Sequence, residues 1–172
     1  SQAFDLIDVA VDARADAVKF QTYSSDTLYS KYTPDFAGYS NIPKLIKDIE
    51  LPRNWQKTLK SYCDDVGIEF MSTPFDEKAV DELYELGVKR FKISGFESTD
   101  PRFIKYVAST GLPLIISLGI GTTLDKLFKI QRWILDVDDV HLDTHDFSNN
   151  QDITYLHCNN AYPTPFTDIN LG

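Results

Sequence analysis

Three stretches of the sequence share one pattern and decide the fold: GIEFMS at 67–72, GVKRFKIS at 87–94 and GLPLIIS at 111–117. In each, a glycine follows an amphipathic stretch and precedes a short run of β-branched and aromatic residues. Glycine just past a helix adopts the left-handed conformation at low steric cost and turns the chain into the next strand. The pattern predicts alternating helices and strands, and Arg14 stands at the corresponding place of a first unit that must turn without glycine.

The repeat extends over the chain and predicts a parallel α/β fold. Strands are expected near 17–21, 68–72, 90–94, 113–117 and 153–157, each separated from the next by a helix, which means right-handed crossovers. An open doubly wound sheet and a closed barrel are the two candidates, and near-equal units favour the barrel. Because a complete barrel takes about 250 residues, we predict that 1–172 is the central part of a single (β/α)8 TIM barrel domain, with about five βα units and without the first strand and the last two.

Helix starts are signalled by proline and by capping residues. Pro52 and Pro101 suit a first helical position. Asp76, Asp100 and Thr122 suit N-caps, because their side-chain oxygens accept hydrogen bonds from the first backbone amides of a helix.

Composition and charge exclude several classes of function. The 172 residues carry 17 Lys and Arg against 26 Asp and Glu, a net charge of −9 that repels nucleic acid and anionic lipid. No apolar run approaches the roughly 20 residues that span a bilayer. Two cysteines, Cys63 and Cys158, are too few for a disulfide framework, so we expect a reducing, cytoplasmic compartment. The chain opens within an amphipathic pattern and has no initiator Met, from which we expect that the start of a parent protein is missing.

Two segments interrupt the repeat. Residues 22–50 form a long connection with four tyrosines, which is either a partly ordered surface excursion or a loop that covers a substrate. Residues 136–152 are rich in Asp and are interpreted as a solvated excursion. Within them His141 and His145 have a spacing that suits a metal only if a helix forms there.

Polar side chains stand at the end of every predicted strand, where a parallel barrel gathers its catalytic groups. They are Lys19, Gln21, Ser72, Thr73, Lys92, Ser94, Glu97, Ser117, His157, Asn159 and Asn160. A lysine inside an apolar strand is expensive to bury unless an anion meets it. Two such lysines, with hydroxyls and amides beside them, predict a pocket for a phosphate or carboxylate.

Each of these residues has a second interpretation. A single lysine is often held in a structural salt bridge or hydrogen bond. Glu97 is either a general acid/base, because a semi-buried carboxyl has a raised pKa, or simply the partner of a lysine. His157 is a ligand, a proton donor or a histidine of the core.

Longer motifs give a specific resemblance. KFQT at 19–22, GIEFMSTPFD at 67–76, KIS at 92–94 with Glu97, LIISLG at 114–119 and LHCNNAYPTPFTDINLG at 156–172 occur in this order. Together they resemble the sialic acid synthase family, which comprises the N-acetylneuraminate synthases and their legionaminate, pseudaminate and spore-coat relatives.

The resemblance implies a (β/α)8 barrel followed by a small antifreeze-like C-terminal domain, which is absent from 1–172. It implies condensation of phosphoenolpyruvate with an N-acetylated amino sugar such as N-acetylmannosamine, with release of phosphate. It also implies a divalent metal, Mn²⁺ or Mg²⁺, and a homodimer of the complete protein. We expect these 172 residues by themselves to be inactive.

The resemblance also assigns site residues. Glu97 matches the family's acid/base glutamate, and the substrate-binding positions match Lys19, Gln21, Thr73, Lys92, Ser117, Asn160 and Tyr162. The resemblance implies that the family's NHxG-type motif and a second glutamate precede Ser1 and that its metal-binding histidines follow Gly172, so no metal ligand is assigned within the chain. Gly95 and Phe96 stand where the family has Ser and Gly, which puts one phosphoenolpyruvate contact in question. SLGI at 117–120 stands where STGM is usual.

Three rival functions remain open at this stage. One is another anion-binding barrel, such as a phosphoenolpyruvate-dependent sugar-acid synthase of a different family or an aldolase. A second is a non-catalytic binding or scaffold protein derived from the barrel, for which Gly95-Phe96 would be early decay. The third is a truncated product that does not fold stably, since open strand edges are unpaired.

Overall fold

The computed structural model describes residues 2–35, 38–119, 121–135, 151–159, 161 and 163–169. These form two compact units, 1–89 and 90–172, which are described separately. Most of the predicted solvated excursion at 136–152, including His141 and His145, lies outside the described residues.

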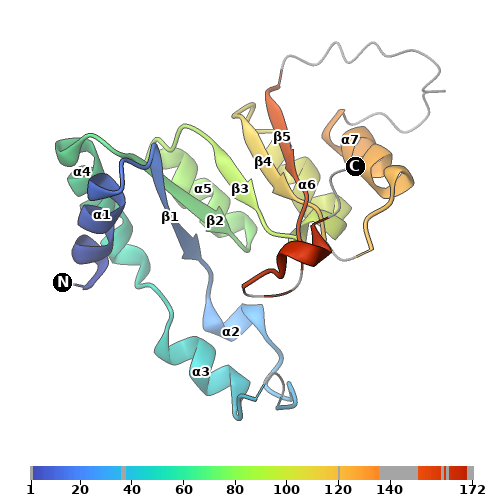
Figure 1. Cartoon of the computed structure of the whole chain (residues 1–172), viewed down its shortest axis with the longest axis horizontal. Coiled ribbons are helices and arrows are strands. Elements are labelled where there is room, and N and C mark those ends of the chain that lie inside the picture. The colour runs from blue at the N-terminus through green and yellow to red at the C-terminus, as the bar shows by residue number, and fades with distance from the viewer. Residues whose placement is uncertain are drawn as a thin grey trace. The chain divides into compact units, whose positions relative to one another are not determined.

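The first unit contains two parallel strands and their helices (Figure 1). Strand β1 (Ala17–Thr22) pairs in parallel with β2 (Glu69–Pro74), with Ala17 opposite Glu69. The helices are α1 (Gln2–Asp12), α2 (Ser25–Leu28), α3 (Ile42–Asp48), α4 (Gln56–Val66) and α5 (Glu77–Glu85), with a 3-10 turn η1 at Arg53–Trp55. Helices α2 and α3 lie beyond the carboxyl end of β1 (Figure 1).

Burial and backbone conformation explain how the first unit forms. Ile7 of α1, Leu59 and Cys63 of α4 and Leu83 of α5 are at most 2% exposed, in agreement with the helical spacing of apolar residues. Gly67 closes α4 at φ 79°, as predicted. Arg14 makes the equivalent turn after α1 at φ 56°, so the prediction of a turn without glycine is confirmed. A side chain in the left-handed region carries a steric cost that the glycine turns avoid.

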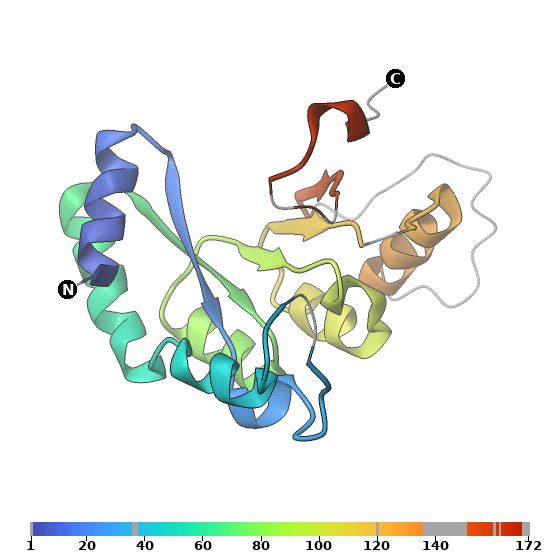
Figure 2. The same ribbon diagram turned by 60° about the horizontal axis from the view of Figure 1, so that its bottom comes forward.

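The second unit contains three parallel strands in the order β3, β4, β5. They are β3 (Phe91–Ile93), β4 (Leu114–Ser117) and β5 (Ile153–Leu156), with helices α6 (Pro101–Ala108) and α7 (Leu124–Leu135). Two 3-10 turns, η2 (Glu97–Thr99) and η3 (Phe166–Asp168), follow β3 and β5. Figure 2 shows the three strands side by side, with α6 and α7 against them.

The two faces of this second sheet differ in chemistry. Phe91, Ile93, Leu114 and Ile116 alternate along β3 and β4 and are at most 1% exposed, so they form the apolar core of the unit. The residues between them point to the opposite face, because side chains alternate along a strand. That opposite face carries Lys92 and Ser117.

Most predicted helix signals are confirmed. Asp76 accepts a hydrogen bond from the Ala79 amide, and Asp100 accepts from Arg102 and Phe103. Pro101 occupies the first turn of α6. Pro52 instead precedes η1, one residue before the first helical position.

The N-cap prediction for Thr122 is wrong. The amide of Lys126 donates to Thr123 Oγ1, whereas Thr122 Oγ1 donates to the Gly119 carbonyl at 2.6 Å. The hydroxyl is drawn into the preceding turn because a carbonyl lies three residues back, and α7 starts one residue later than the spacing suggests.

The five strands and the α/β class with parallel pairing are therefore confirmed in both units. Cys63 and Cys158 are both free thiols. Within the described ranges, no helix combines the length and apolar character that crossing a membrane requires.

Candidate functional site

Lys92 lies at the centre of the polar face of the second unit. The parallel register sets Lys92 beside Ile115, which brings Ser117 onto the same face, near the carboxyl ends of β3 and β4. The lysine is only 7% exposed. Its Nζ donates to Ser117 Oγ at 2.6 Å and to the Ile93 carbonyl at 2.7 Å. These bonds compensate part of the cost of burying the ammonium group and hold it at one position.

Glu97 lies in η2, in the loop that follows β3. The Ser94 hydroxyl donates to its Oε2. Burial raises the pKa of the Glu97 carboxyl, while a hydrogen bond from its own backbone and the nearby charge of Lys92 act in the opposite direction. A raised carboxyl pKa suits a group that gives and takes a proton near neutral pH. The charge of Lys92 therefore acts on Glu97, and the assignment of Glu97 as the acid/base stays a prediction.

The loops after β3 and β4 touch through two glycines. A Cβ on Gly119 would lie 2.5 Å from the Gly95 carbonyl oxygen, and a Cβ on Gly95 would lie 3.1 Å from Gly119 Cα. Both carbonyls are bonded, Gly95 O by Ser98 Oγ at 2.9 Å and Gly119 O by Thr122 Oγ1. Gly95 therefore has a packing role here. The neighbouring Phe96 is 79% exposed.

In the first unit, Lys19, Gln21 and Thr73 share one face. Lys19 pairs with Met71 and Gln21 with Thr73, so all four side chains emerge on the same side of the β1–β2 pair. Thr73 is buried, at 3% exposure. Lys19 and Gln21 are both exposed, so the prediction that Lys19 is buried in an apolar strand is wrong. In this unit its face of β1 is open to solvent, which keeps the ammonium group hydrated.

The opposite face of the same strands carries a structural polar pair. Thr22 Oγ1 and Ser72 Oγ lie 2.7 Å apart, and both residues are 1% exposed. Ser72 therefore forms a structural hydrogen bond inside the first unit and does not lie on the face that carries Lys19, Gln21 and Thr73.

The segment after β5 contains four of the predicted polar or substrate-binding residues, His157, Asn159, Asn160 and Tyr162. Asn160 and Tyr162 lie outside the described residues, so their assignment to the substrate site stays a prediction. His157 is exposed, which excludes its interpretation as a core histidine. The neighbouring Asn159 donates to the Asp168 carbonyl at 2.8 Å and so fixes the turn that contains η3.

The structure thus brings together Lys92, Ser117 and Glu97 of the predicted set, and it shows Ser94, another of the polar strand-end residues, as the partner of Glu97. Lys19, Gln21 and Thr73 form a second group in the first unit. That both groups surround one anion stays a prediction.

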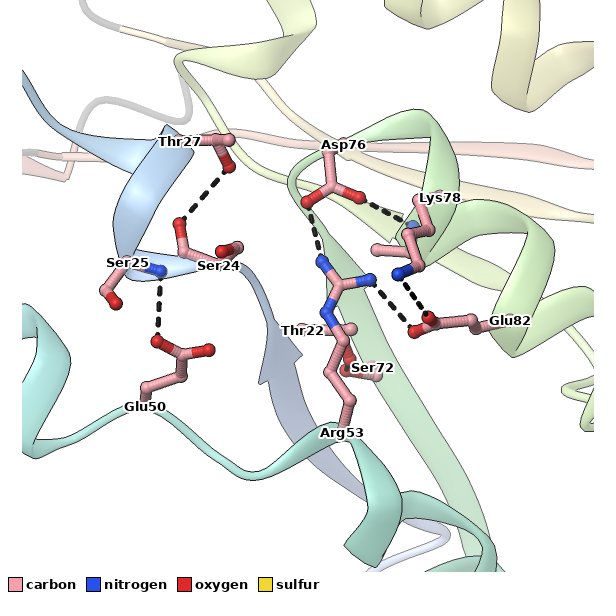
Figure 3. Close-up of polar contacts among 11 residues, drawn as sticks. Thr22, Ser24, Ser25, Thr27, Glu50, Arg53, Ser72, Asp76, Lys78 and Glu82 are labelled. Carbon is pink, nitrogen blue, oxygen red and sulfur yellow. Dashed lines mark hydrogen bonds and ion pairs between the residues drawn. The ribbon is translucent and has the colours of Figure 1, made fainter.

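A further polar cluster escaped the sequence analysis. Arg53 pairs with Asp76 and Glu82 in the first unit (Figure 3). Its partners follow 23 and 29 residues later, so no local sequence pattern predicts this cluster.

The divalent metal implied by the resemblance has no ligand set in this part of the chain. Among the described residues, no three His, Cys, Asp or Glu side chains gather closely enough to hold an ion.

Comparison with known proteins identifies the family. The profile of the NeuB family matches residues 6–172. This chain belongs to the NeuB family. An N,N'-diacetyllegionaminic acid synthase of Legionella pneumophila is 37% identical, over 98% of this chain and 47% of that protein. A pseudaminic acid synthase of Campylobacter jejuni is 30% identical, over 98% of this chain and 48% of that protein.

A solved structure of the NeuB type agrees with the fold. The N-acetylneuraminic acid synthetase of Leptospira borgpetersenii, in complex with citrate, superposes with a TM-score of 0.79 at 27% identity. The match covers 98% of this chain and 52% of that one. The chain spans about half the length of the NeuB relatives it matches. These relatives support nonulosonate synthesis as the general activity of the family to which the chain belongs.

Proposed function

We propose that the chain is the central part of a (β/α)8 synthase barrel. In the full-length protein this barrel condenses phosphoenolpyruvate with an N-acetylated amino sugar, giving a sialic acid-type nonulosonate and inorganic phosphate. The observation that best supports this proposal is the buried Lys92 ammonium group. It is hydrogen-bonded to Ser117, and its charge acts on the Glu97 carboxyl group, whose pKa is raised. A fixed cation, a hydroxyl and an acid/base at the ends of neighbouring strands are what this reaction needs.

The anionic substrate is assigned to the lysines. Lys92 and Ser117 present a cation and a hydroxyl on one face, which suits a phosphate or a carboxylate. Lys19, Gln21 and Thr73 are proposed to complete phosphoenolpyruvate binding from the first unit. Asn160 and Tyr162 are proposed to contact the sugar or the phosphate.

The reaction joins two carbons and releases one phosphate. C3 of phosphoenolpyruvate forms a bond to the aldehyde carbon of the open sugar, whose oxygen takes up a proton. C2 becomes electron-deficient, water adds there, and the C2–O bond to phosphate breaks as C2 becomes a ketone. Glu97 is proposed to supply the proton to the aldehyde oxygen and to regain one from the added water. The Lys92 ammonium group holds the negative charge of the departing phosphate.

The complete protein is proposed to work in the cytoplasm, where Cys63 and Cys158 stay reduced. It is further proposed to be a homodimer, and to take a Mn²⁺ or Mg²⁺ ion through ligands other than the described residues.

The test uses the full-length protein with phosphoenolpyruvate, Mn²⁺ and either N-acetylmannosamine or a diacetylated amino sugar. We expect phosphate release that requires the sugar, together with a product whose mass equals the sugar plus pyruvate. Glu97→Gln serves as the matched inactive control, because the amide keeps the size and accepts the Ser94 hydrogen bond.

Two results contradict the proposal. Phosphate release without any sugar would indicate simple hydrolysis. Binding of phosphoenolpyruvate in calorimetry without turnover on any N-acetylated amino sugar would favour the non-catalytic binding protein.

A further inference from the structure

Arg53 lies where the long 22–50 segment returns to the body of the first unit. It is the first residue of η1, directly before α4. Its side chain is 20% exposed and donates from Nη2 to Asp76 Oδ2 at 2.6 Å and from Nη1 to Glu82 Oε2 at 2.9 Å (Figure 3). One guanidinium group therefore ties the end of the segment to the first two turns of α5.

Asp76 connects this ion pair to the candidate site. It stands three residues after Thr73, which is buried at the end of β2. Its other oxygen, Oδ1, accepts from the Ala79 amide at 2.7 Å and caps α5. The same carboxylate thus fixes the start of the helix and receives the arginine, so a displacement of Arg53 acts on the loop beside Thr73. Charge-assisted bonds with this fork geometry are strong and directional.

The beginning and the end of the 22–50 segment are also tied to each other. Tyr23 is 5% exposed, and its hydroxyl donates to the Ile46 carbonyl at 3.2 Å. The Ser25 amide donates to Glu50 Oε2 at 3.0 Å. The Tyr23 ring meets Phe75 edge-on at 5.9 Å. The described parts of the segment are therefore a folded flap with α2 and α3, held at its base by these contacts and by Arg53.

Loss of Arg53 would leave the carboxylates of Asp76 and Glu82 without the cation that they share. Asp76 and Glu82 would keep Lys78, at 3.8 Å from Glu82, as a cation on their own helix, but that lysine side chain is 79% exposed. An exposed pair of this kind contributes little. The arginine therefore supplies both neutralisation and position.

We propose that Arg53 is a positioning residue for the amino sugar. It holds the flap that leaves the carboxyl end of β1 against the β2–α5 loop, and so fixes the wall on which the sugar's hydroxyl and acetamido groups bind. The proposal rests on the proposed synthase function and deepens it, since it assigns the sugar side of the site to the flap. Misplacing such a wall by about 1 Å costs on the order of 10–100-fold in reactivity.

The experiment compares Arg53→Met and Arg53→Lys with wild type in the full-length protein. The matched control is Lys60→Met, because Lys60 has the same 20% side-chain exposure and pairs with Asp64 inside α4. We measure hydrogen exchange of backbone amides in 23–35 and 38–50, and separately KM for the sugar and for phosphoenolpyruvate. Arg53→Met should speed exchange in both segments and raise KM for the sugar about tenfold or more, with KM for phosphoenolpyruvate changed less than about threefold.

Arg53→Lys should restore part of both effects, because an ammonium group reaches one carboxylate but does not bridge two. Lys60→Met should match wild type. If Arg53→Met does not fold, Glu82→Gln removes one arm of the bridge and gives the same readouts.

Wild-type exchange and sugar KM in Arg53→Met would overturn the proposal, as would an equal rise in both KM values. If the wild-type protein shows no synthase turnover, the proposed function is contradicted, but the structural role of Arg53 is not. Faster exchange in Arg53→Met would then still show that Arg53 holds the flap.

Discussion

Lys19 and Lys92 occupy similar places in the sequence, since each follows an apolar residue in a parallel strand. The exposure of the two side chains nevertheless differs between the two units. Lys19 is exposed on β1, whereas Lys92 is 7% exposed and bonded to Ser117 and Ile93. A lysine in a strand is therefore not in itself a buried cation. The packing over its face decides whether it is a solvated charge or a fixed donor.

The difference extends to the neighbouring carboxyl groups. In the second unit, burial raises the pKa of Glu97 while the charge of Lys92 limits that rise. In the first unit, Asp76 and Glu82 both form ion pairs with Arg53 around the start of α5. One unit therefore contains a partly buried carboxyl group with a raised pKa, and in the other unit the carboxylates form ion pairs that hold the structure.

The strongest test of this contrast is Glu97→Gln. We expect kcat to fall about 10²–10⁴-fold, because the amide cannot transfer a proton. Measurement of phosphate release at saturating substrates gives the change. Asp76→Asn is the counterpart in the first unit and should lower kcat far less, and equal losses would break the contrast.

Next comes Lys92→Ala. Removing a buried cation should raise KM for phosphoenolpyruvate on the order of 30–100-fold, because the anion loses a fixed donor. Steady-state kinetics with varied phosphoenolpyruvate measures it. Unchanged kinetics would remove Lys92 from the site.

Lys19→Ala removes the exposed lysine. We expect KM for phosphoenolpyruvate to rise roughly three- to tenfold, since a solvated charge contributes less than a desolvated one. Thermal unfolding should be unchanged for Lys19→Ala and altered for Lys92→Ala, whose side chain bonds the protein itself. The same loss of stability in both variants would contradict the difference in burial.

Gly119→Ala tests the close contact of the loops in the second unit. Its Cβ would lie 2.5 Å from the Gly95 carbonyl, so the backbone must shift at a cost of about 1–3 kcal/mol. Gly67→Ala is the control in the first unit, where nothing lies within 4 Å and only the positive φ opposes the side chain, at about 1 kcal/mol. Thermal unfolding should show the larger loss for Gly119→Ala, and the reverse order would refute the contact.

The smallest effect concerns pH and stability. Because the folded state raises the pKa of Glu97, the folded protein binds that proton more tightly than the unfolded chain does, and this group makes stability fall as pH rises above about 4.5. Glu97→Gln removes that loss, so its Tm relative to wild type should be higher near pH 7 than near pH 4. The exposed Glu77→Gln provides the reference, and a Tm difference that does not change with pH would contradict the shift.

Much of the fold was predictable because its signals are local. The glycines after α4, α5 and α6, the aspartate caps and the apolar spacing act over a few residues, and Arg14 could be recognised by its position in the repeat. Thr122 shows the limit, since a carbonyl three residues back competes with the helix amides for the same hydroxyl.

The residues of the candidate site were predictable from the sequence, but their burial and their hydrogen bonds were predictable only in part. Strand alternation places Lys92 and Ser117 on one face, and the motif marks Glu97. The bond from Ser94, the contact of Gly95 with Gly119 and the Arg53 bridge depend on loops that meet in space. The exposure of Lys19 likewise depends on what packs over its strand.

By itself, the sequence determined the order of strands and helices, the parallel class and the family, because periodicity, capping and motifs are carried by neighbours in the chain. Which lysine is buried, which carboxyl group has a raised pKa and which carboxylates Arg53 binds depend instead on the tertiary structure. Desolvation and ion pairing depend on distances between segments far apart in the chain, and no local pattern encodes those distances.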